Sequence, residues 1–178
     1  MLSDNIIKLN DLGILLDAKF RELEATDVLG IYNTRVFVNT DGKVITIKNK
    51  SNNDGFVCCI RSVSPVHKKN NDFEYKLYID GRAHSLHKIV ALTFPEICGE
   101  YKKGMEVHHK NLNHLDNNSS NLVFLTTKTH KYIHSILYRS NFDVNLLNRI
   151  NEYIDFCNLV HMEISVDGLE AYLNEAGK

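Results

Sequence analysis

Apolar positions in the first 24 residues recur at near-helical intervals, which predicts one or two amphipathic helices interrupted near residues 11–13. The positions are Ile6, Ile7, Leu9, Leu12, Leu15, Leu16 and Phe20. We expect this apolar face to pack on the domain or on a second subunit. Acidic side chains on the same segment would meet DNA phosphates unfavourably, so a DNA-reading helix is disfavoured here.

From residue 32 the pattern changes to period two, which is the spacing of half-buried strands. Two runs of alternating β-branched and aromatic residues are each interrupted by an Asp-Gly pair, at Asp41 and at Asp80. Asp-Gly between such runs is a strong hairpin signal, so residues 32–47 and 73–87 each predict a β-hairpin.

The segments around these hairpins are shorter and less regular. Residues 56–63 predict an apolar strand, and residues 66–72 a basic, flexible connection. Residues 87–94 predict a short helix that Pro95 stops. We expect that helix to pack by its apolar side chains, Ile89, Val90, Leu92 and Phe94.

A strand, a long polar loop, a second strand and a helix follow. The strands are predicted at residues 105–109 and 122–126, and the helix from Thr127 through Tyr138. Two further helices are predicted at residues 143–160 and 165–175, with Ser165 as the N-cap of the second.

Histidines mark both ends of this strand–loop–strand–helix segment. His108 and His109 are adjacent on the first strand, whereas His130 and His134 are four residues apart and share one helix face. If the helix lies across the hairpin, His108, His130 and His134 come within reach of one cation. His109 points to the other side of its strand and is left for chemistry.

The string V-H-H-K-N…D-N-N-S-S-N-L-V-F-L-T…H-x-x-x-H, over residues 107–134, resembles the HNH endonucleases, the ββα-metal nuclease family. Its intervals are similar to those of the phage homing-type members, and its closing H-x-x-x-H to that of the colicin-type DNases, which hold their metal by three histidines. The β-rich segment and the helix before the motif also resemble parts of phage homing endonucleases.

This resemblance implies a role for each motif residue. His108 would be a metal ligand, His109 the general base, Asn121 the brace of the loop that orients the base, and His130 and His134 the second and third ligands. Hydrolysis of a phosphodiester needs such groups: a neutral imidazole can take a proton from water near pH 7, and a metal ion can stabilise the charge on the phosphate and the leaving oxygen.

The sequence therefore predicts an α+β protein with a β-hairpin-rich N-terminal part, a central ββα-metal motif and a helical C-terminal tail. The expected divisions are an N-terminal helical segment (1–30), a β-rich module (31–86), an HNH nuclease domain (87–140) and a helical extension (141–178). The expected function is hydrolysis of DNA with one divalent ion, and Mg, Mn, Zn and Ni all stay open.

Charge bounds the DNA-binding surface. The 178-residue chain has a formal net charge of −1, so any basic surface must be local. The candidates lie close to the motif: Lys102, Lys103, Lys110, Lys128, Lys131 and Arg139. The acidic tail resembles no DNA-reading module, which leaves packing, a homodimer through the helical segments, or a protein partner for targeting.

Cysteine usage and hydropathy bound the environment. Cys58, Cys59, Cys98 and Cys157 form no C-x-x-C pair, so neither disulfides nor a zinc ribbon is expected. No apolar run approaches the ~20 residues that span a bilayer, and the N-terminus lacks a signal-peptide pattern. We expect no membrane contact and a reducing cytoplasm, in a bacterial or phage-infected cell.

One alternative stays open at this stage. The same histidines could hold a structural zinc ion with His114 or Asp116 as a fourth ligand, in a non-catalytic domain that binds nucleic acid or protein. Stripping the metal would then unfold the domain, because metal-binding energy would be folding energy.

Overall fold

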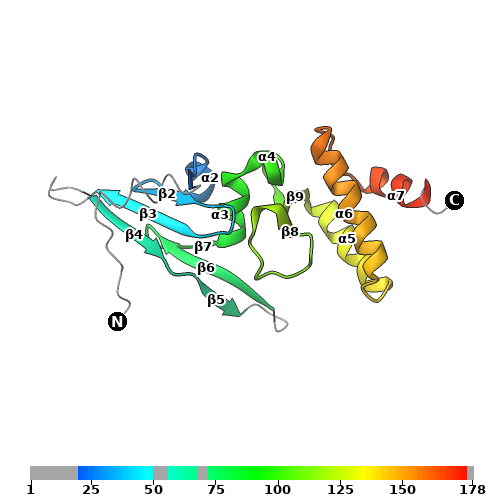
Figure 1. Ribbon diagram of the computed structural model, residues 1–178, viewed down its shortest axis with the longest axis horizontal. Coiled ribbons are helices and arrows are strands. Elements are labelled where there is room, and N and C mark those ends of the chain that lie inside the picture. Colours follow the sequence, from blue (N-terminus) through cyan, green and yellow to red (C-terminus); the bar gives the residue numbers. More distant parts are fainter. Residues whose placement is uncertain (1–19, 50–55, 68–71, 176–178) are drawn as a thin grey trace.

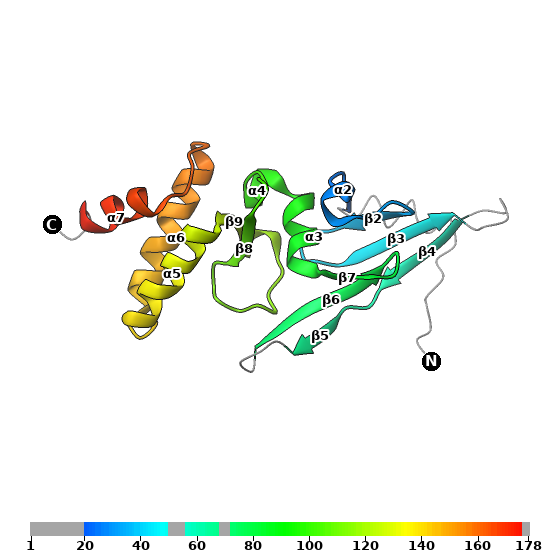
Figure 2. The ribbon, with the colours of Figure 1, turned by 180° about the vertical axis from the view of Figure 1, so that it is seen from behind.

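The computed structural model describes residues 20–49, 56–67 and 72–175. A β-rich module lies at one end of the molecule, three helices lie at the other, and a small hairpin with its long loop lies between them (Figure 1). The same order is seen from behind (Figure 2). The predicted α+β class is confirmed.

The β-rich module contains two antiparallel sheets. The first has the order β1-β2-β3-β4 and the second the order β5-β6-β7. Their strands are β1 (Arg21–Glu22), β2 (Thr34–Val38), β3 (Val44–Asn49), β4 (Phe56–Arg61), β5 (Ser64–His67), β6 (Phe73–Ile79) and β7 (Arg82–Ser85), with the short helix α2 (Thr26–Leu29) between β1 and β2.

Both Asp-Gly hairpins are present, but their turns differ. Asp80 and Gly81 have φ of 49° and 77°, so β6 and β7 are joined by a two-residue turn in which both residues are left-handed. The β2–β3 turn is longer: the Asn39 side chain accepts hydrogen bonds from the Asp41 and Lys43 backbone amides at 3.1 and 2.8 Å. Here only Gly42 has a positive φ, of 79°.

Two helices pack against the sheets and lead to the central hairpin. Helix α3 (Leu86–Thr93) is buried along most of its length, as its apolar residues predict. Pro95 does end it, but also begins α4 (Pro95–Cys98), since proline is well suited to the first turn of a helix. The main core forms where α3 packs on both sheets and on one face of the hairpin.

The central hairpin is β8 (Met105–His109) paired with β9 (Leu122–Thr126), and a 3₁₀ turn (Ser119–Asn121) precedes the second strand. Helix α5 (Thr127–Arg139) follows directly. Helices α6 (Val144–Leu159) and α7 (Val166–Glu175) pack on α5 around a second core, to which the hairpin's other face contributes Val123 and Leu125. Ser165 caps α7, since its hydroxyl accepts the Gly168 amide at 3.1 Å.

Two predictions about local structure were wrong. Residues 21–22 form a strand, where the helical pattern was extended through residue 24; the rest of that prediction, residues 3–19, falls outside the described residues. Residues 66–67, predicted as the start of a flexible connection over residues 66–72, belong to strand β5, and residues 68–71 of that prediction lie outside the described residues. The side chains of β5 are all exposed, so the strand is held by backbone pairing with β6 and carries no burial pattern.

In the part of the chain that the structure describes, no helix has the length and apolar character needed to cross a bilayer.

Candidate metal and catalytic centre

The pairing register of the central hairpin sends the two adjacent histidines to opposite faces. His108 pairs with Val123, and His109 pairs with Leu122. Val123 belongs to the core beneath α5, whereas Leu122 belongs to the core beneath α3. Because side chains alternate along a strand, His108 faces α5 and His109 faces α3, as predicted.

Helix α5 brings its two histidines to the His108 face. The helix is capped by Thr126, whose hydroxyl accepts the Thr129 amide at 3.1 Å, so its first turn is fixed to the end of β9. Thr129 and Ile133 are buried, and His130 and His134 lie next to them, one turn apart.

The three imidazoles that the spacing predicted as ligands are brought together. The ring centroid of His108 lies 5.3 Å from that of His130 and 5.2 Å from that of His134, and the last two are 4.7 Å apart. One nitrogen from each ring lies within 4.8 Å of the others. The cluster could therefore bind a divalent metal ion.

His108 carries the clearest signature of a ligand. It is only 1% exposed, and neither ring nitrogen has a hydrogen-bond partner among the described residues. Desolvation, followed by the neighbouring imidazoles of His130 and His134, lowers the pKa of His108 to about 2. The ring is thus neutral at physiological pH, and a cation is the group that would satisfy its buried lone pair.

His130 and His134 share these features in part. Their Nε2 atoms are 3.2 Å apart, so two ring edges already converge on one point. Burial, and then the charge of His130, lowers the pKa of His134. Both rings are therefore placed to offer Nε2 toward the same position as His108.

Glu106 is a member of this site that the sequence did not reveal. Its Oε2 lies 2.7 Å from His130 Nδ1, and its Oε1 accepts the Thr127 hydroxyl at 3.0 Å. Desolvation acts to raise the pKa of Glu106, but the hydrogen bonds from Thr127 and His130 outweigh it and lower that pKa. An ionised Glu106 keeps the proton of His130 on Nδ1 and leaves Nε2 as the ligand atom.

His109 lies among a second set of rings on the other face. The side chain is 3% exposed, and its ring centroid lies 5.3 Å from that of His87 and 5.1 Å from that of His114. His114 Nδ1 in turn lies 2.6 Å from a carboxylate oxygen of Asp72, which comes from the β-rich module. The pairing of Asp72 with His114 could not be predicted from the sequence, because the two residues are 42 positions apart.

Asn121 spans the long loop between the strands. Its side-chain oxygen Oδ1 accepts a hydrogen bond from the Asn111 backbone amide at 2.9 Å, and its Nδ2 donates to the Asn111 side-chain oxygen and to the Asp116 backbone carbonyl, both at 2.9 Å. The Lys110 amide, next to His109, donates to the Asn121 carbonyl at 2.8 Å. Asn121 therefore fixes both ends of the loop to each other.

Neither residue considered as a fourth ligand joins the cluster. The carboxylate of Asp116 accepts hydrogen bonds from the Asn111 side chain and the Asn118 amide, at 2.7 and 3.2 Å, and so holds the loop. His114 lies on the His109 side. His134 was the other candidate for a further ligand, and its ring does lie with those of His108 and His130.

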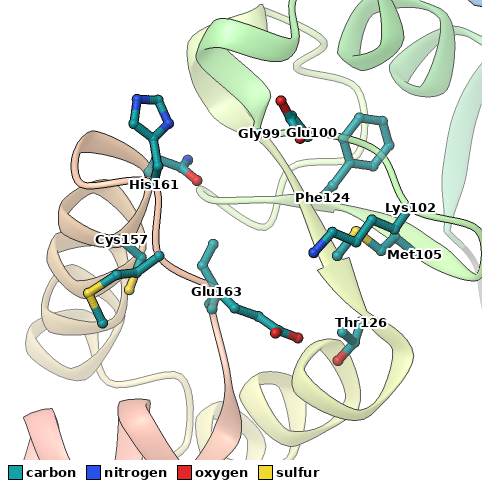
Figure 3. Close-up of a pocket in the computed structure, with 12 residues that line it drawn as sticks. Gly99, Glu100, Lys102, Met105, Phe124, Thr126, Cys157, His161 and Glu163 are labelled. Atoms are coloured by element: carbon teal, nitrogen blue, oxygen red, sulfur yellow. The ribbon is translucent and has the colours of Figure 1, made fainter.

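The predicted DNA-contacting cations fall into two groups. Lys110 is paired with Asp155 of α6 at 2.8 Å, and Lys102 lines a cleft of about 340 Å³ at the opposite end of the hairpin, near Glu163 (Figure 3). The others are exposed, three of them on α5: Lys103, Lys128, Lys131 and Arg139. Lys102 is exposed as well, so five of the six lie on open surface and only Lys110 is partly buried.

A solved structure described as "DNA binding and cleavage by the HNH homing endonuclease I-HmuI" is similar to the chain, with a TM-score of 0.39 and 23% identity over 67% of this chain. The chain covers 62% of that relative's length. None of the curated proteins matches the chain.

Residues 94–132 match the family model of the HNH endonucleases. The matched segment contains β8, β9 and the start of α5, and hence His108, His109, Asn121 and His130, while His134 lies two residues beyond it. The match supports a nuclease activity for this chain. Residues 94–132 therefore form an HNH endonuclease motif, which confirms the resemblance predicted from the sequence.

Proposed function

We propose that this protein is a metal-dependent endonuclease that hydrolyses phosphodiester bonds in DNA. The observation that carries the proposal is His108: a neutral, buried imidazole that faces two other imidazoles, next in the chain to a histidine on the opposite face of the strand. A fold that needed only packing at this position would be better served by an apolar side chain, because a buried polar group without a partner costs free energy.

His108, His130 and His134 would hold one divalent ion. When bound, the ion would supply positive charge for the phosphate and for the leaving oxygen. Glu106 would fix the tautomer of His130, so that its ligand nitrogen is available without rearrangement. Three imidazoles favour Zn or Ni over Mg or Mn by ligand affinity.

His109 would take the proton from the attacking water. Asn121 would act through the loop, since its hydrogen bonds hold the chain that leaves His109 in one conformation. A positioned general base contributes roughly 10²- to 10⁴-fold to such a reaction. Lys103, Lys128, Lys131 and Arg139 would contact the DNA backbone around this centre.

The donor set favours a catalytic over a structural metal. Structural zinc sites are closed by four protein ligands, whereas catalytic sites keep a position open. The cluster found among the described residues has three ligands. The zinc-stabilised binding domain therefore has less support than the nuclease.

The test is cleavage of supercoiled plasmid by purified protein with added Mg, Mn, Ni or Zn. We expect nicked circles with at least one of these ions and no cleavage by His109→Ala. The matched control is His161→Ala, an exposed histidine on the loop between α6 and α7, which should cleave as the wild type does. Folded wild-type protein that leaves DNA intact with every ion would refute the proposal.

The form of the product bears on the assembly. One centre cuts one strand, so a monomer would give nicked circles, and linear product at low enzyme concentration would require the homodimer predicted through the helical segments. Sedimentation of the protein with and without DNA separates these cases.

A further inference from the structure

A carboxylate–histidine pair lies beside the proposed base, on the side away from the metal ligands. Asp72 immediately precedes β6 in the β-rich module, whereas His114 lies in the middle of the loop between β8 and β9. Their atoms Oδ2 and Nδ1 are 2.6 Å apart, a separation typical of a strong hydrogen bond to a charged group. Neither residue has a role in the function proposed above.

The pair is not needed to fasten the loop to the module. The loop is already bound to the β2–β3 turn, because the Ser119 amide donates to the Thr40 carbonyl at 2.8 Å and the Asn118 side chain to Asp41 at 3.2 Å. Gly42 packs closely there, and a Cβ at this position would lie 3.3 Å from the Asn117 carbonyl oxygen. The Asp72–His114 pair is therefore a third connection between the loop and the module, and it can serve another purpose.

The orientation of His114 supplies that reason. Asp72 occupies Nδ1, so the opposite edge of the ring, with Nε2, is the edge left to meet a ligand. The side chain is 30% exposed, in contrast to the fully enclosed His109 ring only 5.1 Å away between centroids. His114 is thus the accessible imidazole on this side of the centre.

His114 also lies next to the proposed base, because its ring centroid is 5.1 Å from that of His109. A phosphodiester attacked by a water molecule at His109 would therefore lie beside a histidine whose ring is held by the Asp72 carboxylate.

We propose that His114 contacts the scissile phosphodiester through Nε2, as a further catalytic residue, and that Asp72 positions it. The inference rests on the proposed nuclease function. His114 would donate a hydrogen bond to a nonbridging phosphate oxygen, a group that gains negative charge as the water attacks. Asp72 would touch no substrate and act only by fixing the ring of His114.

Two isosteric substitutions at His114 separate this role from a structural one. The amide nitrogen of glutamine reaches the position of Nε2, whereas that of asparagine reaches the position of Nδ1. Each protein is assayed at saturating metal and in excess over DNA. Under these conditions we expect His114→Ala to cleave about 10- to 100-fold more slowly than the wild type in a single turnover, as for a lost hydrogen bond to a charged group. His114→Gln should recover part of that rate and His114→Asn should not.

Asp72 is tested through its dependence on His114. Asp72→Asn should slow cleavage less than His114→Ala, and the double variant should be no slower than His114→Ala alone, within about twofold, because Asp72 acts through that ring. Metal affinity, measured by calorimetry, and the melting temperature should stay close to wild type in all of these variants. His161→Ala is again the control.

The outcomes are distinct. If wild-type protein cleaves and His114→Ala cleaves equally fast, the inference fails and the nuclease proposal stands. Recovery by His114→Asn rather than His114→Gln, or multiplicative losses in the double variant, would show a structural connection and overturn it. Wild-type protein without activity would refute both proposals together.

Discussion

The histidines on the two faces of strand β8 have different surroundings. On the α5 face His108 is dry, neutral and without a hydrogen-bond partner among the described residues, and the two rings nearest to it come from one helix. On the α3 face His109 lies beside rings from two separate segments, one of which is bonded to a carboxylate of the β-rich module. Under the proposed function, the first face would hold the metal ion and the second would take the proton from the attacking water.

The largest effect is expected at His109. Replacing it by alanine should slow single-turnover cleavage by roughly 10²- to 10⁴-fold, the range for a lost general base. Metal affinity should stay unchanged, because the ring lies on the face away from the ligands. Quench-flow measurement of the rate, with calorimetry of the metal, checks both parts, and a matching loss of metal would erase the distinction between the faces.

A smaller but clear effect is expected from Glu106→Gln. The glutamine can keep a hydrogen bond to His130 but no longer favours a proton on Nδ1, so metal affinity should fall about 10- to 100-fold. Glu163→Gln, an acidic residue at the cleft of Figure 3, is the control and should leave affinity unchanged. Equal affinity of Glu106→Gln and wild type would show that the tautomer of His130 is not set by this carboxylate.

Burial of His108 on the α5 face should also make the stability of the metal-free protein depend on pH in the acidic range. The folded-state pKa of His108 is about 2, below its ordinary value of 6.5, so between these values the unfolded chain binds a proton that the folded chain does not. The free energy of unfolding should therefore fall as pH drops below about 6.5, by up to about 1.4 kcal/mol per pH unit from this group.

Denaturant titrations in chelator at several pH values measure this slope. His108→Leu removes the titrating group and should show a shallower pH dependence than the wild type. Identical slopes would mean that His108 is not held neutral by burial.

The smallest effects are expected at the predicted DNA-contacting cations. Among these, Lys110 is paired with a carboxylate, whereas Lys131 is exposed. Lys110→Ala breaks a partly exposed ion pair with Asp155 and should cost less than about 1 kcal/mol of stability, with no change in the salt dependence of DNA binding. Lys131→Ala should reduce the magnitude of the log–log salt slope by about one, as for one lost phosphate contact. The reverse pattern would place the DNA on the α6 side of the loop.

The hairpins, most of the longer helices and the histidine cluster could be predicted from sequence, because their signals are local. The Asp-Gly pairs predicted both outer hairpins, apolar periodicity predicted α3, α6 and α7, and the spacing of His108, His130 and His134 predicted the cluster. In each case residues a few positions apart decide the structure through strand or helix periodicity. The register then follows, since a shift by one residue would exchange the faces of His108 and His109.

What could not be predicted depends on contacts between distant segments. The pairing of Asp72 with His114 joins residues 42 positions apart, and that of Lys110 with Asp155 requires α6 to lie against the loop. Strand β5 contains Pro65 and exposes every side chain, so no hydrophobic alternation marks it. Glu106 was closer to being found: it lies two residues before His108, on the same strand face, within reach of the first turn of α5.

The central claim is that His108 holds the metal and His109 does not, although the two are neighbours in the chain. Calorimetric titration of Zn or Ni into wild-type, His108→Ala and His109→Ala protein tests it most directly. We expect one ion per chain in the wild type and in His109→Ala with equal affinity, and a loss of binding in His108→Ala. Equal losses in both variants, or none in either, would contradict the claim.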